Sequence, residues 1–323
     1  MREIVRHEYG SPEVLELRDV DKPLPGDDEL LVRVHAASVN PLDWHSVTGT
    51  PYVVRLSDGL RRPKDERVGV DFAGTVEAVG PRVTRLRPGA EVFGGKSGAF
   101  AEYVVVREGR SVASKPAGLT FEEAASVPVA AVTALQGLRD KGQLRAGQKL
   151  LINGASGGVG TFAVQIAKAL GADVTGVCST RNLDTARSLG ADDVVDYTRE
   201  DFTRSGKRYD LLLDIAGSRS WPECRRVLGD DARLVIVGGP KTNRWLGPLG
   251  RMATLRLASV GRSQSVIPFI AKLKREDLET LRALLEAGSV RPVVDRSYEL
   301  GDVPNALAYL GKGHARGKVV ITV

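Results

Sequence analysis

The segment with the clearest chemical content is a glycine-rich loop, LLINGASGGVG, at residues 150–160. Within it, G-x-S-x-G centred on Ser156 matches the turn that exposes a nucleophilic serine between a strand and a helix. Ala155, Gly157 and Gly160 spell instead A-x-G-x-x-G, which is close to the loop that receives a dinucleotide pyrophosphate at a helix N-terminus. Both interpretations require a strand before the loop and a helix after it, so the surrounding elements must decide between them.

Two different patterns of apolar residues divide the chain. Up to about Lys115 the apolar residues form short alternating runs between Pro and Gly turns, which predicts a mostly antiparallel β-domain. From residue 121 onward helical patterns alternate with short apolar runs, which predicts βαβ units and a parallel sheet covered on both faces. The predicted strands of this part are 149–153, 174–178, 193–197, 210–215 and 233–238, with helices beginning near Gly158, Asn182 and Trp221. There follow an apolar run at 266–270, an amphipathic helix with Leu278, Leu281, Leu284 and Leu285 on one face, and a strand at 318–323.

This layout favours the dinucleotide interpretation of the loop. In an α/β-hydrolase the serine turn follows several strands, whereas this loop follows the first strand of the α/β part. A serine triad would need His314, which lies in the charged segment GKGHARGK, and no HGGG segment precedes the loop to form an oxyanion hole. The hydrolase and a purely structural glycine turn are the alternatives. The residues expected to hold a pyrophosphate are Ala155, Ser156, Gly157, Gly158, Val159 and Gly160.

The end of the second strand predicts which dinucleotide is bound. NAD-selective domains place an acidic residue there, about 20 residues beyond the loop, to hold the ribose 2′-hydroxyl. Here the chain reads CSTRN at 178–182 without an acid, and Asp184 is expected in the first turn of the next helix. Ser179 and Arg181 can donate to a 2′-phosphate, so NADPH is the predicted cofactor. The alternative for Arg181 is a solvated loop cation.

Composition limits the remaining possibilities. The chain has 323 residues, about two domains' worth, with 42% hydrophobic and 27% charged residues, which is typical of a soluble globular protein. No apolar run approaches a membrane span, and the start MREIVRHEYG is not a secretory signal. The net charge of +6 suits an anionic ligand, whereas the scattered basic residues do not predict nucleic-acid binding. Two cysteines, Cys178 and Cys224, fit a reducing cytoplasm.

Several motifs together resemble the zinc-free, quinone oxidoreductase-like branch of the medium-chain dehydrogenase/reductase superfamily. They are ASVNPLDW (37–44), GVDFAGTVEAVG (69–80), GAEVFG (89–94), SVPVAAVTALQGL (126–138), the GASGGVG loop, AVQIAKALGADVTGVCSTRN (163–182) and HARGKVVITV (314–323). The resemblance spans essentially the whole chain. It implies an α/β protein in which a GroES-like β-barrel catalytic domain, 1–125 plus 265–323, surrounds a doubly wound, parallel-sheet Rossmann domain at 126–264. It also implies a homodimer.

The resemblance also assigns roles to residues near the expected reaction centre. Asn40 and Asp43 are expected beside the nicotinamide and its ribose, and Thr133 on the carboxamide side. Tyr52 is expected either to donate a proton or orient the substrate, or else to form a pocket wall, and the following segment 53–67 is longer and more basic than usual. Two further positions expected at the cofactor are Tyr197, resembling a tyrosine of the 2′-phosphate pocket, and Gly238, at the end of RLVIVG. The alternative for Asn40 and Asp43 is turn chemistry around the intervening proline.

Missing metal ligands narrow the reaction. Zinc-containing members of the superfamily place a cysteine where Asn40 stands, a His-Glu pair at Val70 and Asp71, and a four-cysteine lobe after residue 90. This chain has no cysteine before Cys178, so we expect no metal site. Without a Lewis acid, hydride addition to a quinone or an α,β-unsaturated carbonyl is favoured over alcohol oxidation. The alternatives are an enoyl reductase for polyketide or fatty-chain thioesters and a non-catalytic, crystallin-like NADPH-binding protein.

Overall fold

The chain folds into two compact units. The computed structural model describes residues 1–239, 245, 247–261 and 263–323. Unit 1 comprises Met1–Val132, Lys272–Gly288 and Pro292–Val323, and unit 2 comprises Thr133–Ala271 and Ser289–Arg291. The domain limits expected from the sequence, 125/126 and 264/265, lie slightly before the two main transitions, and the assignment of domains stays a prediction.

Unit 1 is built on a seven-stranded sheet with the order β14-β15-β3-β4-β5-β7, in which β6 also pairs with β3. Its strands are β3 (Glu29–Val39), β4 (Asp71–Val79), β5 (Glu91–Gly95), β6 (Tyr103–Arg107), β7 (Val112–Ser114), β14 (Val294–Glu299) and β15 (Lys318–Thr322). All pairs are antiparallel except β14 with β15, which confirms the antiparallel pattern predicted for the N-terminal part. A separate hairpin pairs β1 (Arg2–Val5) with β2 (Glu16–Asp19).

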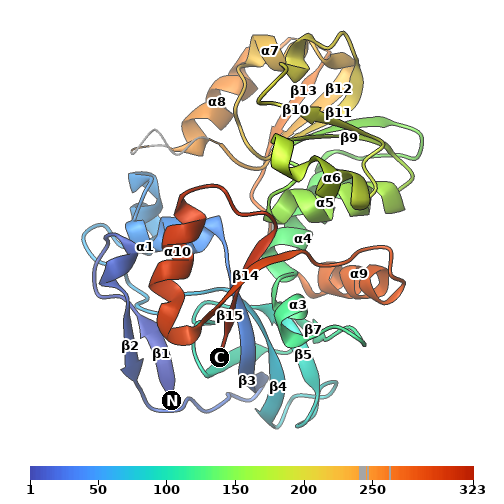
Figure 1. Ribbon diagram of the computed structural model, residues 1–323. Coiled ribbons are helices and arrows are strands. Elements are labelled where there is room, and N and C mark those ends of the chain that lie inside the picture. The colour runs from blue at the N-terminus through green and yellow to red at the C-terminus, as the bar shows by residue number, and fades with distance from the viewer. Residues whose placement is uncertain (240–244, 246, 262) are drawn as a thin grey trace. The chain divides into compact units, whose positions relative to one another are not determined.

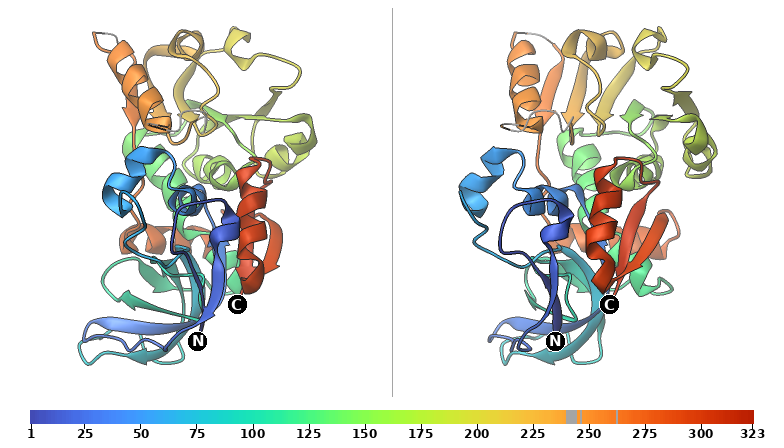
Figure 2. Two further views of the ribbon diagram at one scale, coloured as in Figure 1. Left: turned by 90° about the vertical axis from the view of Figure 1, so that its left-hand side faces the viewer. Right: turned by 60° about the vertical axis from the view of Figure 1, so that its left-hand side comes forward.

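The last strand of unit 1 connects distant parts of the sequence. β15 pairs with β3 so that Val319 lies opposite Val39, and the two ends of the chain lie side by side in every view (Figures 1 and 2). Apolar residues of β3 take part in two clusters of the core, Val32 together with Phe72 in one and Ala37 together with Ile321 in the other.

Short helices complete unit 1. They are α1 (Pro41–Thr48), α2 (Arg55–Asp58), α3 (Phe121–Ala125), α9 (Arg275–Glu286) and α10 (Val303–Gly311), with one-turn 3₁₀ segments at Pro12–Val14, Tyr52–Val54 (η2) and Leu300–Asp302. α9 buries the predicted leucine face through Leu278, Leu281 and Leu285. Helix α4 (Pro128–Leu135) spans the transition to unit 2 and continues as a π-helical turn at Gln136–Lys141.

Unit 2 contains a six-stranded parallel sheet with the order β10-β9-β8-β11-β12-β13. The strands are β8 (Lys149–Asn153), β9 (Asp173–Cys178), β10 (Asp193–Asp196), β11 (Tyr209–Asp214), β12 (Leu228–Ile236) and β13 (Ser265–Pro268). The helices are α5 (Gly158–Ala169), α6 (Leu183–Ser188), α7 (Trp221–Arg225) and α8 (Pro248–Ala258), with 3₁₀ turns at Thr180–Asn182 (η4) and Phe202–Arg204. The parallel sheet confirms the βαβ pattern of the sequence.

The strand order of unit 2 reverses at β8. The chain runs outward from β8 through β9 to β10 and then returns to β11 on the other side of β8. Because crossover connections are right-handed, this reversal places α5 and α6 on one face and α7 and α8 on the other, as Figure 1 shows. The carboxyl ends of β8 and β11 therefore flank the point where open parallel sheets bind ligands.

β12 begins at Leu228, five residues before the predicted start at 233, because the polar residues of LGDDA separate the first residue of the strand from its apolar run. Among the helices that the structure describes, none is long and apolar enough to cross a membrane.

Candidate functional site

The glycine-rich loop lies between β8 and α5, as predicted. The left-handed turn falls on Gly154, with φ of 103°, and not on Ala155. Ala155 is fully buried, and the amides of Gly154 and Ala155 donate to the Val177 carbonyl of β9 at 3.1 and 3.0 Å. An alanine is accepted at the first position of the motif because glycine supplies the positive φ one residue earlier.

Gly157 and Gly160 are glycines for different reasons. A Cβ on Gly160 would overlap the carbonyl oxygen of Gly154 and lie 2.7 Å from the carbonyl carbon of Ala155, so close packing of helix on loop excludes it. Gly157 has φ −83° and ψ 178°, an extended conformation open to any residue. Among the described residues, a Cβ there would meet only the Gly154 oxygen at 3.9 Å.

The start of helix α5 beside Gly157 favours an anionic group. Helix α5 begins at Gly158, so the amides of Gly158 and Val159 belong to the first turn and have no acceptor within the helix. The positive end of the helix dipole favours negative charge at the same place. A side chain at 157 would occupy the position beside these amides. A bound anion would therefore explain the glycine, whereas packing against the described residues does not.

The end of β9 is connected to the loop by Asn182, at the end of η4. The side-chain amide of Asn182 donates to Ser156 Oγ at 3.0 Å and to Ser179 Oγ at 3.2 Å. Its backbone amide donates to the Ser179 carbonyl at 2.9 Å, and the residue is 5% exposed. The sequence indicated Asn182 only as a residue near the start of a helix.

The end of β10 brings a carboxylate beside β9. Asp196 lies opposite Cys178 in the sheet and accepts hydrogen bonds from Thr180 Oγ1, Thr198 Oγ1 and the Thr198 amide. The hydrogen bond from Thr180 is the main cause that lowers the pKa of Asp196. The sequence shows no acid at the end of β9 itself. Asp196 could have been found from its position at the end of the next predicted strand, which lies beside β9 in the sheet.

Three residues predicted for the 2′-phosphate surround this end of β9. Ser179 follows the strand directly, and Arg181 lies two residues later and is exposed. The Tyr197 amide donates to the Cys178 carbonyl at 3.1 Å, and the Tyr197 side chain is half exposed. The sheet register therefore places Tyr197 next to Ser179, although the two are far apart in sequence.

Gly238 lies two residues beyond β12, where a Cβ would overlap the carbonyl oxygen of Ile215. Close packing against the backbone of Ile215 therefore explains why residue 238 is a glycine. Beside it, the Asp214 carboxylate accepts the Asn153 side-chain amide at 2.8 Å and pairs with Arg251 at 2.7 Å. This group stands at the carboxyl ends of β8 and β11, and only the polar residues at those strand ends point to it in the sequence.

In unit 1, Asn40 and Asp43 form the start of α1. The Asp43 carboxylate accepts a hydrogen bond from the backbone amide of Asn40 at 2.7 Å, which is half of a capping box around the first turn. Asp43 is 1% exposed. Burial first and the nearby Asp71 second raise the pKa of Asp43 to about 7.

A buried network of charged and polar groups holds the Asn40 side chain. Its amide nitrogen donates to Asp71 Oδ2 at 2.9 Å, and its oxygen accepts Lys318 Nζ at 2.6 Å. Lys318 lies 3.5 Å from Asp71 Oδ2, and Ser38 Oγ donates to the same oxygen at 3.0 Å. We call Ser38, Asn40, Asp43, Asp71 and Lys318 the Lys318 network. Asp71 and Lys318 are missing from the residues predicted for the site, although GVDFAG and ARGKVV both carried the resemblance.

The charges in the Lys318 network depend on one another. Burial raises the pKa of Asp71 and lowers that of Lys318, while each charge favours the charged form of the other. The network holds two carboxyl groups for one ammonium group. A proton on Asp43 therefore balances the charge below about pH 7.

Replacing Asp43 by asparagine should remove a pH dependence of stability. Folded Asp43 keeps its proton up to about pH 7, whereas its ordinary pKa is 3.8. The unfolded chain then binds fewer protons than the folded chain, so this group's contribution to the free energy of unfolding falls as the pH rises from about 4 to about 7. Asp43→Asn keeps a side-chain oxygen that can accept the hydrogen bond from the backbone amide of Asn40. Urea unfolding across this range should give a flatter pH profile for the variant, and identical profiles would contradict the assignment.

Tyr52 begins the 3₁₀ turn η2 at the start of the long basic segment. The Arg55 guanidinium lies 4.8 Å from the centre of the Tyr52 ring and 4.4 Å from that of Tyr9. Arg55 Nε also donates to the Gly49 carbonyl at 2.9 Å. Tyr52 is therefore positioned by a stacked cation whose own position is set by two other segments.

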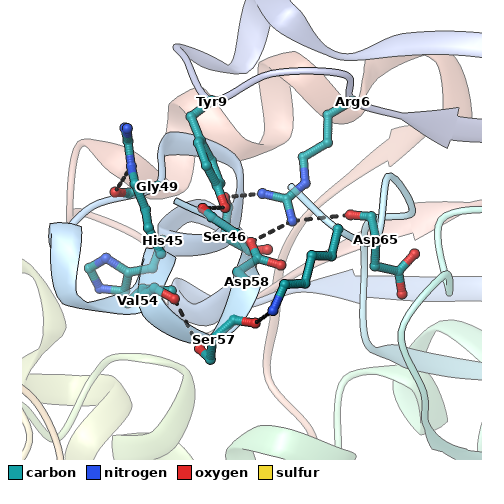
Figure 3. A network of polar contacts seen from close by, with 12 residues as sticks. Arg6, Tyr9, His45, Ser46, Gly49, Val54, Ser57, Asp58 and Asp65 are labelled. Carbon is teal, nitrogen blue, oxygen red and sulfur yellow. Dashed lines mark hydrogen bonds and ion pairs between the residues drawn. The ribbon is translucent and has the colours of Figure 1, made fainter. Parts of the chain in front are cut away.

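Buried Arg6 holds the segment 53–67 against the N-terminal hairpin (Figure 3). Arg6 is 1% exposed and donates to Asp58 Oδ2 at 2.8 Å, to the Asp65 carbonyl at 3.3 Å and to the Ser46 carbonyl. The Tyr9 hydroxyl donates to the Gly59 carbonyl at 2.7 Å. The extra length of this segment is thus an ordered part of unit 1.

Thr133 lies in α4, is 8% exposed and is the first residue of unit 2, whereas Asn40, Asp43 and Tyr52 belong to unit 1. The structure brings Asn40 and Asp43 together in the Lys318 network and gathers the loop residues with Ser179 in unit 2. That Thr133 acts with the residues of unit 1 stays a prediction.

The described residues also bear on metal, thiol and serine chemistry. Within the described ranges no three His, Cys, Asp or Glu residues form a cluster that could hold a metal ion. Burial raises the pKa of the thiols of Cys178 and Cys224 to about 11 and about 12. Residues 133–271, which include Ser156, contain no histidine that could act as a base in a hydrolase.

Two family models match the chain. A model described as alcohol dehydrogenase GroES-like domain matches residues 26–117, and a model described as zinc-binding dehydrogenase matches residues 189–321. The first model lies in unit 1, and the second covers the later strands of unit 2 and the C-terminal part of unit 1. The two models together match parts of both units.

Individual relatives extend over nearly the whole chain. A mitochondrial NAD(P)H oxidoreductase of Mus musculus is 35% identical, covering 98% of this chain and 87% of the relative. The 2-methylene-furan-3-one reductase of Solanum lycopersicum is 33% identical, covering 97% of this chain and 77% of the relative. The solved quinone oxidoreductase from Coxiella burnetii is 29% identical with a TM-score of 0.88, covering 100% and 99% of the two chains. The chain therefore belongs to the quinone oxidoreductase-like family of medium-chain dehydrogenases/reductases, and it is an oxidoreductase with an α/β fold.

Proposed function

We propose that this oxidoreductase transfers hydride from NADPH to a quinone or an α,β-unsaturated carbonyl compound. The observation that carries the proposal is the open space in front of Gly157, bordered by the first-turn amides of α5. Neither backbone conformation nor packing against described residues requires glycine there. A bound pyrophosphate does require it, because its oxygens need direct access to the backbone.

The proposed binding residues follow the carboxyl edge of the sheet in unit 2. Residues 154–160 would hold the pyrophosphate, Gly238 would line the pocket, and Ser179, Arg181 and Tyr197 would hold the 2′-phosphate. When bound, NADPH supplies the hydride. The names of the relatives, a quinone oxidoreductase and a furanone reductase, support the two proposed classes of acceptor.

The proposed residues on the substrate side are Asn40, Asp43, Tyr52 and Thr133. Both ends of the Asn40 amide are occupied by Lys318 and Asp71, so we assign Asn40 to shaping the pocket and not to proton transfer. The Tyr52 hydroxyl is the proposed proton donor, or the group that orients the acceptor. Hydrogen bonds at this place would stabilise negative charge that develops on the acceptor oxygen.

A direct assay tests this proposal. Purified protein is mixed with NADPH and, separately, a quinone, a simple enone and an enoyl thioester, and oxidation of the cofactor is followed by absorbance. We expect turnover with the quinone or the enone. NADPH binding without turnover would favour the non-catalytic alternative, and strong preference for the thioester would favour the enoyl reductase.

Arg181→Ala should weaken NADPH binding by roughly 10- to 100-fold and leave NADH binding nearly unchanged, because a charge-assisted hydrogen bond contributes about 1.5–3 kcal/mol. The measurement is kcat/KM for both cofactors. Arg187→Ala is the matched control, since Arg187 pairs with Asp184 on the exposed side of α6.

Two outcomes would contradict this assignment of Arg181. One is an equal loss for NADPH and NADH, which would make the effect a general one. The other is an unchanged protein that prefers NADH, in which case the Asp196 carboxylate at the end of β10 would be the group that selects the cofactor.

The wider setting of the proposal rests on the sequence. We propose a homodimer that binds neither nucleic acid nor membranes, and a reducing compartment such as the cytoplasm, where the free buried thiols of Cys178 and Cys224 would persist. The relative from Mus musculus is named as mitochondrial. Chromatography with light scattering would test the dimer.

A further inference from the structure

Asn182 joins two serines that the chain supplies from separate turns. Ser156 follows β8 and Ser179 follows β9, and the Asn182 amide nitrogen donates to both hydroxyl oxygens, at 3.0 and 3.2 Å. An amide nitrogen has two hydrogens. Both are used here, one for each serine.

The direction of these hydrogen bonds determines what the serines can do. A hydroxyl group carries one hydrogen and two lone pairs. Because each serine oxygen accepts a hydrogen from Asn182, its own hydrogen remains available to an outside acceptor. In the part of the chain that the structure describes, no residue accepts the hydrogen of the Ser156 or Ser179 hydroxyl.

The surroundings make Asn182 a fixed support. It is 5% exposed, and its backbone amide is anchored on the Ser179 carbonyl at 2.9 Å. Both serines are partly exposed, unlike the asparagine between them. The Val177 carbonyl, two residues before Ser179, accepts the amides of Gly154 and Ala155, which fixes the loop to the end of β9 a second time.

We propose that Asn182 is a positioning residue that sets the Ser156 and Ser179 hydroxyls as a pair of donors for the phosphate groups of NADPH. This inference rests on the proposed function. Ser156, beside the Gly157 space, would donate to the pyrophosphate, and Ser179 would donate to the 2′-phosphate. Asn182 couples the two phosphate positions without touching the cofactor, so it contributes to the choice between NADPH and NADH.

The test is a double-mutant cycle on cofactor affinity, measured by calorimetric titration of NADPH and of NADH. Asn182→Leu keeps a similar volume and removes both donated hydrogen bonds. We expect NADPH to bind roughly 10- to 100-fold more weakly and NADH only a few-fold more weakly, because NADH lacks the phosphate that Ser179 would contact. Asn182→Leu combined with Ser179→Ala should then have nearly the same NADPH affinity as Asn182→Leu alone.

Controls separate positioning from damage to the fold. Asn305→Leu makes the same change at an exposed site on α10 and should leave both affinities unchanged. Thermal unfolding and circular dichroism report whether Asn182→Leu is folded. Asn182→Asp, which can only accept from the serines, should weaken NADPH at least as strongly as Asn182→Leu, since it turns both hydroxyl hydrogens inward.

Each result has a distinct meaning. Unchanged NADPH affinity in folded Asn182→Leu, or additive losses for Asn182→Leu and Ser179→Ala, would overturn the role of Asn182 while leaving the proposed function intact. Equal losses for NADPH and NADH would also overturn it, as a sign of general damage to the loop. Failure of the unchanged protein to bind either cofactor would instead refute the proposed function.

Discussion

Gly157→Val should leave the protein folded and yet reduce its affinity for NADPH by at least about 100-fold. The backbone at 157 is extended, and outside its two chain neighbours the nearest described atom to a new Cβ is 3.9 Å away, so the described residues leave room for the Cβ of a valine. Its branched side chain would occupy the space proposed for the pyrophosphate. Calorimetric titration with NADPH, alongside thermal unfolding, measures both parts of this expectation.

Two other glycines make the comparison specific. Gly109→Val places the same side chain in open space in unit 1 and should change neither affinity nor stability. Gly160→Ala should instead lower the stability, because its Cβ would overlap the Gly154 carbonyl. Normal NADPH affinity in folded Gly157→Val would place the cofactor elsewhere.

Lys318→Met should lower the free energy of unfolding by about 3–5 kcal/mol, the usual cost of removing one partner from a buried ion pair. Lys318 is 3% exposed and Asp71 is fully buried, so the remaining carboxylate has no access to water. The Asn40 oxygen would lose its donor at 2.6 Å as well. Urea unfolding at neutral pH measures the effect.

A second variant distinguishes charge from packing in the same network. Lys318→Met combined with Asp71→Asn removes both charges and should recover part of the lost stability, because no buried carboxylate is left unpaired. A loss of less than about 1 kcal/mol in Lys318→Met, or a double variant whose loss equals the sum of the single ones, would contradict the proposed pairing.

The sequence predicted those elements whose pattern of residues lies within one short segment of the chain. The loop at 154–160, the strands around it and the start of α5 follow from periodicity and glycine spacing within one short segment, and these predictions are confirmed. The antiparallel and parallel parts of the chain were distinguished in the same way. Such patterns reflect the burial of one segment at a time.

The interactions that the sequence did not predict all cross between elements. Asn182 meets Ser156 only because β9 lies next to β8, and Asp196 reaches Thr180 only through the register of β10. Lys318 meets Asn40 because β15 pairs with β3 from the other end of the chain. Strand order and register determine these contacts, and neither is encoded in a local pattern.

The position of Lys318 also has a consequence for the order of folding during synthesis. Asp71 emerges from the ribosome 247 residues before the lysine that neutralises it, and residues 133–271 emerge in between. Until β15 is made, the sheet of unit 1 lacks a strand beside β3 and its buried carboxylate lacks a counter-charge. We expect unit 2 to acquire structure first on the growing chain, and unit 1 to stay open, and exposed to chaperones and proteases, until its C-terminal strand arrives.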